Sequence, residues 1–443
     1  MLKRLLFTAK RGTIFALSTP PGKSAIALIR VSGNNASSLF PVANPKIAKF
    51  AKLKDNDGNL IDTAILTFFK GPNSYTGEDV LEIATHGSIA VIRAIYNHLE
   101  MNDCRLADKG EFTHRAYLNN KINISSIESL GSLLDAETEL QRKAALLPKL
   151  NDGILFERWR NSLVYLLAMY EAQIDFGEDD QIDPDLLNSA LIKMKSMLYE
   201  ISRFLEDSQK VAKLKAGINI AICGIPNAGK SSFINRLCKE QVSIVSEIAG
   251  TTRDVVQKYI NIGGYPFTIS DTAGIHNSEN KIEQIGIQRA LGAIENAAIV
   301  FFIFDPTQDL ESQKSLLASI NKKSGHVLIL CNKSDVVKSP LQLCKTQIPL
   351  SCTSEEGFEE FHNRFIELLQ SNFSVPDFIV FQNNQITPLN NIIGIIKESL
   401  FEEDIVLKAE LLRRAIQNIE QQSSPVDLDH VLDSLFSQFC IGK

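Results

Sequence analysis

A glycine-rich loop with a lysine stands directly after an apolar run that is typical of a buried strand. The loop, GIPNAGKS at 224–231, matches the phosphate-binding pattern GxxxxGK[ST], and the apolar run covers 218–223. Glycines let backbone N–H groups wrap phosphates, Lys230 can neutralise the terminal ones, and the Ser231 hydroxyl can ligate Mg2+. The sequence therefore predicts a site for a nucleoside triphosphate.

Two further motifs follow in the order that a GTPase requires. DTAG at 271–274 follows the strand-like run 267–270, and NKSD at 332–335 follows the apolar run 327–331. DxxG alone arises by chance roughly once or twice in a chain of this length, and NKxD alone is only suggestive, so order and context give the pair its weight. Asp335 can accept hydrogen bonds from N1–H and the 2-amino group of guanine, which adenine does not offer there. The predicted nucleotide is GTP.

Two weaker segments complete the predicted nucleotide site. In GTTRD at 250–254, Thr252 is expected to join Ser231 as a Mg2+ ligand, although an ordinary polar turn is the alternative. The segment SCT at 351–353 is expected where such domains touch the base with backbone amides. The predicted GTP-binding residues are Asn227, Ala228, Gly229, Lys230, Ser231, Ser232, Thr251, Thr252, Asp271, Gly274, Asn332, Lys333, Asp335 and Ser351.

The position after DTAG is Ile275, where a Ras-like switch carries the glutamine that orients the attacking water. An isoleucine has no group that can hold water in place. The chain must therefore place the water with another residue, hydrolyse GTP slowly, or receive help from a partner.

The motifs and their spacing resemble the MnmE (also called TrmE) family of tRNA-modification GTPases. The resemblance in the nucleotide domain lies in GIPNAGKSS, IAGTTRDV, DTAG and IEQIGI at 282–287. It resumes in the first part of the chain with TIFA, TPPGK, ALIRVSG, SYTGEDVLE, THG and GEFTHRAYLNNK, and it returns in the terminal CIGK. The resemblance spans nearly the whole chain.

For hydrolysis, the resemblance implies a glutamate acting as general base through a water, at the position of Glu283. It also implies K+ in place of an arginine finger, since a cation beside the β and γ phosphates does the same electrostatic work. The implied K+ ligands are Asn227, Ser246, Ile248 and Thr251. Without the family, Glu283 reads as an exposed helix carboxylate and Asn227 as a good turn residue.

For the first part of the chain, the resemblance implies a domain similar to tetrahydrofolate-binding aminomethyltransferase domains. In the family this domain forms the homodimer and holds a formyl- or methylene-tetrahydrofolate. The matching folate-contact residues are Arg30, Glu82, Lys121 and Lys443, each of which otherwise reads as a surface charge. A carboxylate suits a pterin amidine edge and cations suit a glutamyl tail. Cys440 is a possible reactive residue or a packing residue.

The expected fold class is multidomain α/β plus all-α, with a helical bundle and an inserted Ras-like P-loop G domain. Helical spacing of apolar residues on both sides of the G domain indicates the bundle. The stripes are Leu155, Trp159, Leu163, Leu166 and Tyr170; Met194, Leu198, Ile201 and Leu205; Ile405, Ala409, Leu412, Ile416 and Ile419; and Val431, Leu435 and Phe439. The expected domains are a possible targeting segment at 1–12, the α/β folate-binding and dimerisation domain at 13–122, the discontinuous helical domain at 123–214 and 375–443, and the G domain at 215–374.

The composition of the chain says more about its cellular compartment than about its chemistry. The net charge of −6 gives no general sign of nucleic-acid binding, yet residues 1–54 hold ten Lys or Arg and no Asp or Glu. The basic, apolar segment 1–11 favours a mitochondrial address, with a bacterial-type cytoplasm as the alternative. Seven cysteines without CxxC spacing suggest a reducing compartment and no zinc site. No apolar run reaches the ~18 residues of a membrane span.

Taken as a member of this family, the chain is expected to hydrolyse GTP and so drive an aminomethyl-type modification at carbon 5 of the wobble uridine of certain tRNAs. The expected partners are tRNA and an MnmG-like FAD protein. One alternative is a ribosome-assembly GTPase, a class that usually carries a second GTPase module or a KH module, neither of which appears after Ser374. Another is a folate enzyme with an inserted regulatory G domain.

Overall fold

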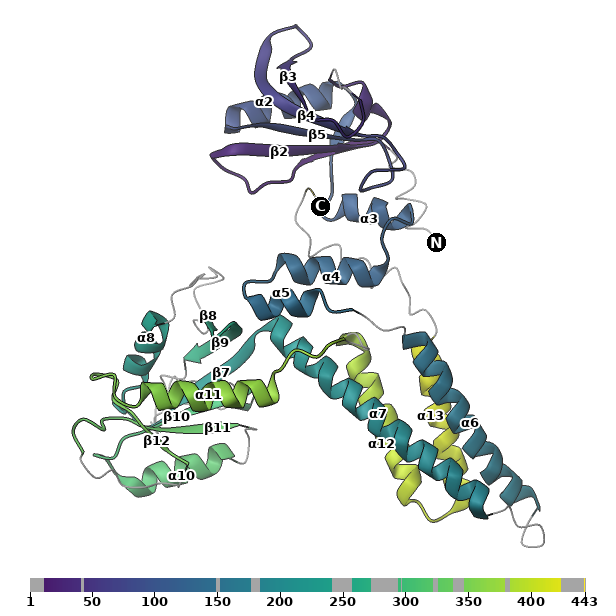
Figure 1. The fold of residues 1–443 in the computed structure, drawn as a ribbon, viewed down its shortest axis with the longest axis vertical. Coiled ribbons are helices and arrows are strands. Elements are labelled where there is room, and N and C mark those ends of the chain that lie inside the picture. The colour runs from purple at the N-terminus through teal and green to yellow at the C-terminus, as the bar shows by residue number, and fades with distance from the viewer. Residues whose placement is uncertain are drawn as a thin grey trace, which may run out of the picture. The chain divides into compact units, whose positions relative to one another are not determined.

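The computed structural model describes residues 12–40, 44–148, 152–176, 184–240, 257–271, 294–295, 297–321, 326–337, 346–378, 383–423 and 442. The described residues form two compact units, one of 12–134 with Gly442 and one of 135–423 (Figure 1). Residues 123–134 and Gly442, which were predicted to belong to the helical domain, group here with the N-terminal unit. None of the helices in the described ranges is both long and apolar enough to cross a bilayer.

The N-terminal unit is built on a mostly antiparallel sheet. Its strands are β1 (Thr13–Leu17), β2 (Ser24–Ser32), β3 (Lys49–Lys54), β4 (Leu60–Phe69), β5 (Val80–Gly87) and β6 (Cys104–Leu106). Their order is β3-β4-β5-β2-β1-β6, and only β1 and β6 run parallel. The helices are the 3-10 turn η1 (Asn34–Ser37), α2 (Ile89–Met101), α3 (Glu111–Leu118) and α4 (Ile124–Leu134).

Buried and exposed side chains alternate along the strands, which shows that one face of this sheet is covered more fully than the other. In β3, Ala51 and Leu53 are buried while Lys52 and Lys54 are exposed, as expected for a strand with one covered face. The covered face packs on α2 and contributes to the main core of the unit. On the opposite face, α3 packs against β1 through Phe112. The sheet therefore keeps an uncovered area over β3 and β4.

The second unit contains a parallel sheet with helices on both faces. Its strands are β7 (Ile218–Cys223), β8 (Gln257–Ile262), β9 (Tyr265–Asp271), β10 (Ile299–Phe304), β11 (Val327–Cys331) and β12 (Ile348–Pro349), in the order β12-β11-β10-β7-β9-β8. Only β8 pairs antiparallel, with β9. The packed helices are α8 (Lys230–Glu240), α10 (Leu310–Asn321) and α11 (Phe358–Asn372). This arrangement is a P-loop G domain.

The central strands of this sheet are apolar on both faces, so helices must cover both sides of the sheet. All six residues of β10 are buried, as a parallel strand covered on two faces requires. One face packs on α8 and α11, where Phe233, Phe301, Phe361 and Phe365 cluster. The other face packs on α10. The functional loops emerge where these buried strands end.

Four long helices make a separate core in the same unit. They are α6 (Asp152–Phe176), α7 (Pro184–Ala216), α12 (Asn383–Phe401) and α13 (Ile405–Ser423), and they lie side by side in Figure 1. The first three predicted stripes lie in this core or pack against it, whereas Val431, Leu435 and Phe439 fall outside the described residues. Helices from before and after the G domain thus share one core.

Two helices tie the bundle segments to the G-domain sheet. The helix α7 has 33 residues and continues past the bundle to Ala216, and Leu214 near this end is buried in the core of the sheet. The short α5 (Glu139–Ala145) begins with a capping box between Thr138 and Gln141, and the Gln141 side chain donates to Lys215 O at 3.3 Å. The predicted start of the G domain at 215 therefore falls inside a continuous helix.

Candidate functional site

The phosphate loop at 224–231 lies between the end of β7 and the start of α8. Two of its glycines are required by packing. A Cβ at Gly224, where φ is +148°, would stand 2.4 Å from Ile303 O, and a Cβ at Gly229 would stand 2.1 Å from Nδ2 of Asn332. Backbone leaves no room for a side chain at Gly224, and at Gly229 a side chain would have to displace Asn332 and adopt φ of +100°, so the loop holds a tight turn that requires glycine.

Lys230 opens α8 and folds back over the loop. Its Nζ donates to the carbonyl oxygens of Gly224 at 2.9 Å and Ile225 at 2.8 Å. Ser231 and Ser232 follow in the first turn and are exposed. The N-terminus of a helix carries partial positive charge and unpaired N–H groups, which favour an anion. This end of α8 can therefore receive a phosphate, with a lysine and two hydroxyls beside it.

Asn332, the first residue of NKSD, links three loops. It is only 4% exposed. Its Nδ2 donates to Ala228 O in the phosphate loop at 2.8 Å, and its Oδ1 accepts from the backbone N of Cys352 at 3.1 Å. The side chain thus fixes the distance between the phosphate loop and the SCT segment, and both of its polar ends are used inside the protein.

Lys333 follows in a left-handed conformation, with φ of +64°, and pairs with a buried carboxylate. Its Nζ lies 2.6 Å from Oδ2 of Asp305, the residue directly after β10. Burial opposes ionisation of Asp305, but hydrogen bonds from Lys333, Thr307 and Gln308 outweigh it and lower the pKa of this carboxyl. The Asp305 carboxylate is therefore ionised at neutral pH, and its contact with Nζ holds the lysine stem next to the loop.

Asp335 presents a carboxylate to solvent at the end of the same motif. Hydrogen bonds from the Ser351 hydroxyl, and more weakly from Thr353, lower the pKa of Asp335. Thr353 Oγ1 donates to Oδ2 at 3.2 Å. Ser351 itself is buried, and its Oγ accepts from the backbone N of Thr353 and of Ser354, each at 3.2 Å. An exposed, ionised carboxylate so oriented can accept hydrogen bonds from a ligand.

Asp271, the first residue of DTAG, ends β9. It pairs with Ile222 of β7, one residue before that strand ends. Because β7 and β9 are parallel, their carboxyl ends meet at one edge of the sheet, and β10 and β11 end at the same edge. This edge thus brings together the phosphate loop, Asp271 of DTAG and NKSD.

In the N-terminal unit, Arg30 and Glu82 are cross-strand neighbours on β2 and β5. Arg30 Nε and Nη2 donate to the same Glu82 oxygen, Oε1, at 3.1 and 2.8 Å. The guanidinium lies 5.4 Å from the ring centre of Tyr75 and 6.0 Å from that of Phe112. The structure therefore brings two of the predicted folate residues into contact, on a platform flanked by aromatic rings.

Lys121 and the end of the chain lie in the same unit. Lys121 follows α3, and its Cε would be 3.2 Å from a Cβ placed on Gly77, so its stem runs along the loop of residues 75–78. Gly442 lies against the end of β1, where Ser18 Oγ donates to its carbonyl oxygen at 3.2 Å. Lys443 is outside the described residues, but its neighbour reaches this unit.

Comparison with known proteins places the chain in a family. A family model described as the GTP-binding protein TrmE N-terminus matches residues 13–121, and one described as 50S ribosome-binding GTPase matches residues 219–333. The tRNA modification GTPase MnmE of Ehrlichia ruminantium is 37% identical over 97% of this chain and 100% of its own length. The chain belongs to the MnmE family. It is therefore a GTP hydrolase that acts in tRNA modification.

Other MnmE relatives match this chain over a similar share of its length. Those of Anaplasma marginale and Pelagibacter ubique are each 35% identical and cover 98% and 97% of this chain, with 100% of their own lengths. These MnmE proteins are bacterial, which is consistent with the bacterial alternative and gives no support to the mitochondrial address. The basic segment 1–11 on which that expectation rested lies outside the described residues.

Two solved structures are similar to part of this chain. The G domain of the T. maritima FeoB iron transporter is 23% identical, with a TM-score of 0.28, and the match covers 34% of this chain and 99% of that one. Aquifex aeolicus Era is 22% identical with a TM-score of 0.29, covering 43% and 69%. The fold assignment for this MnmE-family chain therefore rests on its own strand order and loops.

Several residues predicted from the MnmE resemblance cannot be located. They lie in three stretches outside the described residues. These are the segment before DTAG that holds predicted K+ and Mg2+ ligands, the segment that begins at 272, and residues 424–443 apart from Gly442. The affected predictions are those for Ser246, Ile248, Thr251, Thr252, Gly274, Glu283, Cys440 and Lys443. The side chain of Asp271 is also outside the description. These assignments stay predictions.

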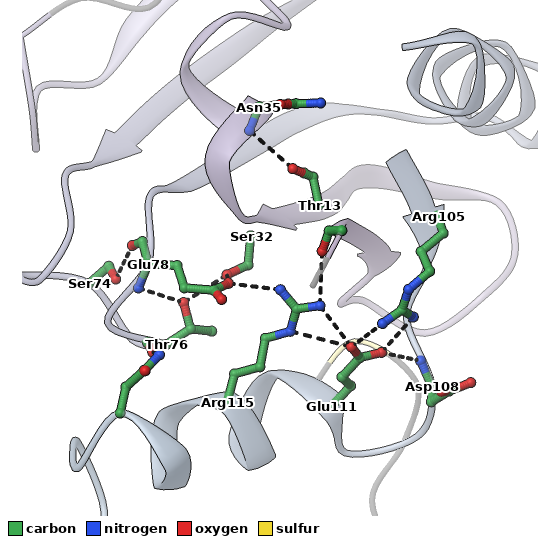
Figure 2. Close-up of polar contacts among 12 residues, drawn as sticks. Thr13, Ser32, Asn35, Ser74, Thr76, Glu78, Arg105, Asp108, Glu111 and Arg115 are labelled. Atoms are coloured by element: carbon green, nitrogen blue, oxygen red, sulfur yellow. Dashed lines mark hydrogen bonds and ion pairs between the residues drawn. The ribbon is translucent and has the colours of Figure 1, made fainter. Parts of the chain in front are cut away.

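A buried ion-pair network in the N-terminal unit was not predicted from the sequence (Figure 2). Arg115 donates to Glu78 Oε2 and to Glu111 Oε1, both at 2.9 Å, and Arg105 Nη1 donates to Glu111 Oε2 at 2.9 Å. Ser32 on β2 donates to Glu78 at 2.8 Å. Glu111 is 1% exposed, and although burial opposes ionisation, its arginine and backbone partners lower its pKa.

This network holds the loop of residues 75–78 between β2 and α3, and that loop flanks both Arg30 and Lys121. Removing one partner of a buried ion pair typically costs about 3–5 kcal/mol. The two segments that carry the network, SYTGEDVLE and GEFTHRAYLNNK, were noticed only for their likeness to the family. The sequence signal for this network was the spacing of Glu111 and Arg115, which places opposite charges one helical turn apart.

Proposed function

We propose that this chain is a K+-dependent GTPase whose hydrolysis cycle drives, together with an MnmG-like FAD protein, a folate-dependent aminomethyl-type modification at carbon 5 of the wobble uridine of tRNAs. The observation that carries the proposal is full-length membership of the MnmE family, with a G domain and a TrmE-type domain on one chain. GTP turnover is then coupled to chemistry in another domain through conformational change.

The nucleotide is proposed to bind at the edge of the sheet where β7, β9, β10 and β11 end. The phosphates lie over the phosphate loop and Lys230, Mg2+ is held by Ser231 and Thr252, and guanine is read by Asp335. The geometry supports this, since the glycines leave no room for other residues and Asn332 joins the phosphate loop to the base loops. Bound Mg2+ supplies charge neutralisation for the phosphates.

K+ is proposed to replace an arginine finger at Asn227, which sits in a left-handed turn with φ of +57°. We expect GTP turnover to be at least several-fold faster in KCl than in NaCl at equal ionic strength, because a fitted cation stabilises charge developing on the phosphates. Steady-state rates in the two salts measure this. Asn227→Ala should flatten the difference, whereas Asn235→Ala, on the exposed face of α8, should keep it. Identical wild-type rates in both salts would sink the K+ assignment.

The folate is proposed to bind around Arg30, Glu82, Lys121 and Lys443. Both hydrogen bonds from Arg30 go to Oε1 of Glu82, so Oε2 is not engaged by the arginine and can accept from a pterin amidine. Tyr75 and Phe112 beside the guanidinium offer ring surfaces. The folate supplies the carbon when bound, and these residues hold and orient its ring and tail.

A homodimer through the N-terminal unit is proposed, and an apolar row on the uncovered face of its sheet supports it. Leu28, Ala84, Ile65 and Phe50 are paired across four strands, so they lie on one face. Phe50 is 69% and Ile65 49% exposed. Exposed apolar residues gathered in this way favour a protein interface over water.

The proposed function predicts that a strain lacking this chain carries wobble uridines without the carbon 5 group. Wild-type chain should restore the modification, measured by mass spectrometry of tRNA nucleosides. Glu82→Gln should restore it poorly, because an amide cannot receive the amidine as a carboxylate does, and calorimetry should show at least ~10-fold weaker folate binding. Glu100→Gln, an exposed change on α2, is the control. Full modification in the deletion strain would refute the proposal.

A further inference from the structure

One buried carboxylate stands between the two halves of the proposed nucleotide site. Asp305 is 0% exposed and follows β10 directly. Its Oδ1 accepts from the backbone N and the hydroxyl of Thr307, at 3.0 and 2.7 Å. Its Oδ2 accepts from Lys333 Nζ at 2.6 Å and from Gln308 Nε2 at 2.8 Å. Four donors thus converge on one group that has no contact with solvent.

The same group is connected to the phosphate loop. Gln308 Nε2, besides donating to Asp305, donates to Pro226 O at 3.2 Å. Asp305 therefore faces the base side through Lys333 and the phosphate side through Gln308. The Gln313 side chain holds the backbone N and O of Asp305 at 3.0 and 2.9 Å, which fixes the carboxylate itself. Asp305, which joins Lys333 to Gln308, is therefore held in place by Gln313.

We propose that Asp305 is a positioning residue for nucleotide binding, acting through Lys333 on the base side and through Gln308 on the phosphate loop. The inference rests on the proposed role of Lys333 in binding the nucleotide. A lysine stem has many rotamers, and a ligand that must order it binds more weakly than one that finds it ordered. Asp305 holds the ammonium before the nucleotide arrives, and it keeps Lys333 in its left-handed conformation.

The test is a set of variants in the full-length chain, with Kd for GDP and for a non-hydrolysable GTP analogue and with KM and kcat for GTP. Asp305→Asn should weaken both nucleotides about 10-fold and leave kcat at saturating GTP within about twofold, because it removes binding common to ground and transition states. Asp309→Asn removes an exposed carboxylate four residues on and should bind normally. Lys333→Met should weaken binding by itself.

The decisive measurement is the double variant. If Asp305 acts through Lys333 and Gln308, then Asp305→Asn should add to the loss in Lys333→Met no more than the ~3-fold effect expected through Gln308. Multiplicative losses, or normal affinity in Asp305→Asn, would overturn the inference while leaving the proposed role of Lys333 standing. Normal affinity in Lys333→Met would refute that role and the inference with it.

A second variant keeps the test decisive if Asp305→Asn does not fold, as thermal melting would reveal. Gln308→Met keeps the length of a half-buried side chain and removes only the donors to Asp305 and Pro226. It should weaken both nucleotides about threefold, the effect of losing two weak hydrogen bonds that tie Asp305 to the phosphate loop, and this loss should persist in the Lys333→Met background. Unchanged affinity in Gln308→Met would then overturn the inference.

Discussion

Asp335→Asn is expected to lower GTP affinity by about 100-fold or more, since two hydrogen bonds to a charged acceptor are lost. The wild-type carboxylate is exposed, ionised and held by Thr353, so it is placed to accept from guanine N1–H and the 2-amino group. The asparagine amide can instead donate to the 2-oxo group of xanthine. Competition binding with GTP and xanthosine triphosphate measures the exchange of preference.

A control variant checks that the change of nucleotide preference comes from base recognition and not from a general loss of folding or binding. Asp309→Asn removes an exposed carboxylate elsewhere in the same domain and should keep the preference for GTP. In the Asp335→Asn protein, hydrolysis of xanthosine triphosphate should approach the wild-type rate with GTP. A variant that still chose GTP strongly over xanthosine triphosphate would show that another residue reads the base.

Glu283→Ala is expected to lower kcat for GTP by roughly 100-fold or more while GTP affinity stays normal, as for loss of a group that aligns and activates water. Ile275 after DTAG cannot do this, and we propose that Glu283 does it instead. Single-turnover hydrolysis in KCl, with nucleotide binding measured separately, distinguishes the two effects.

Glu279 lies in the same stretch of sequence and gives a matched control. Glu279→Ala makes the same chemical change four residues earlier and should keep most of the rate. Undiminished turnover in Glu283→Ala, or an equal loss in Glu279→Ala, would mean that the chain uses a different water-positioning group or an external activator.

Contiguous motifs were predictable from the sequence because their residues act through local backbone geometry. The apolar runs 218–223 and 327–331 are β7 and β11 with the same bounds, and the phosphate loop follows the first as expected. Bundle stripes such as Trp159 and Leu163 were predictable for a similar reason, since helical spacing alone puts them on one buried face.

Contacts between distant segments were not predictable in this way. Nothing local marks Asp305 as the partner of Lys333, 28 positions on, or Arg115 as the partner of Glu78. The bounds of the helical domain also depended on such contacts, since α4 is an ordinary helix in sequence and joins the N-terminal unit only through packing. Tertiary contacts, and not propensity, decide these features.

The continuity of α7 has a mechanical consequence. At 1.5 Å per residue, its 33 residues make a rod about 50 Å long. One end is buried among the strands through Leu214, and the part from Ala190 to Leu205 is buried among the other long helices. A tilt of about 5° at the sheet would sweep the far end through roughly 4 Å, over this length. The helix is therefore long enough for a small rotation at its base to become a displacement the size of a side chain at its other end.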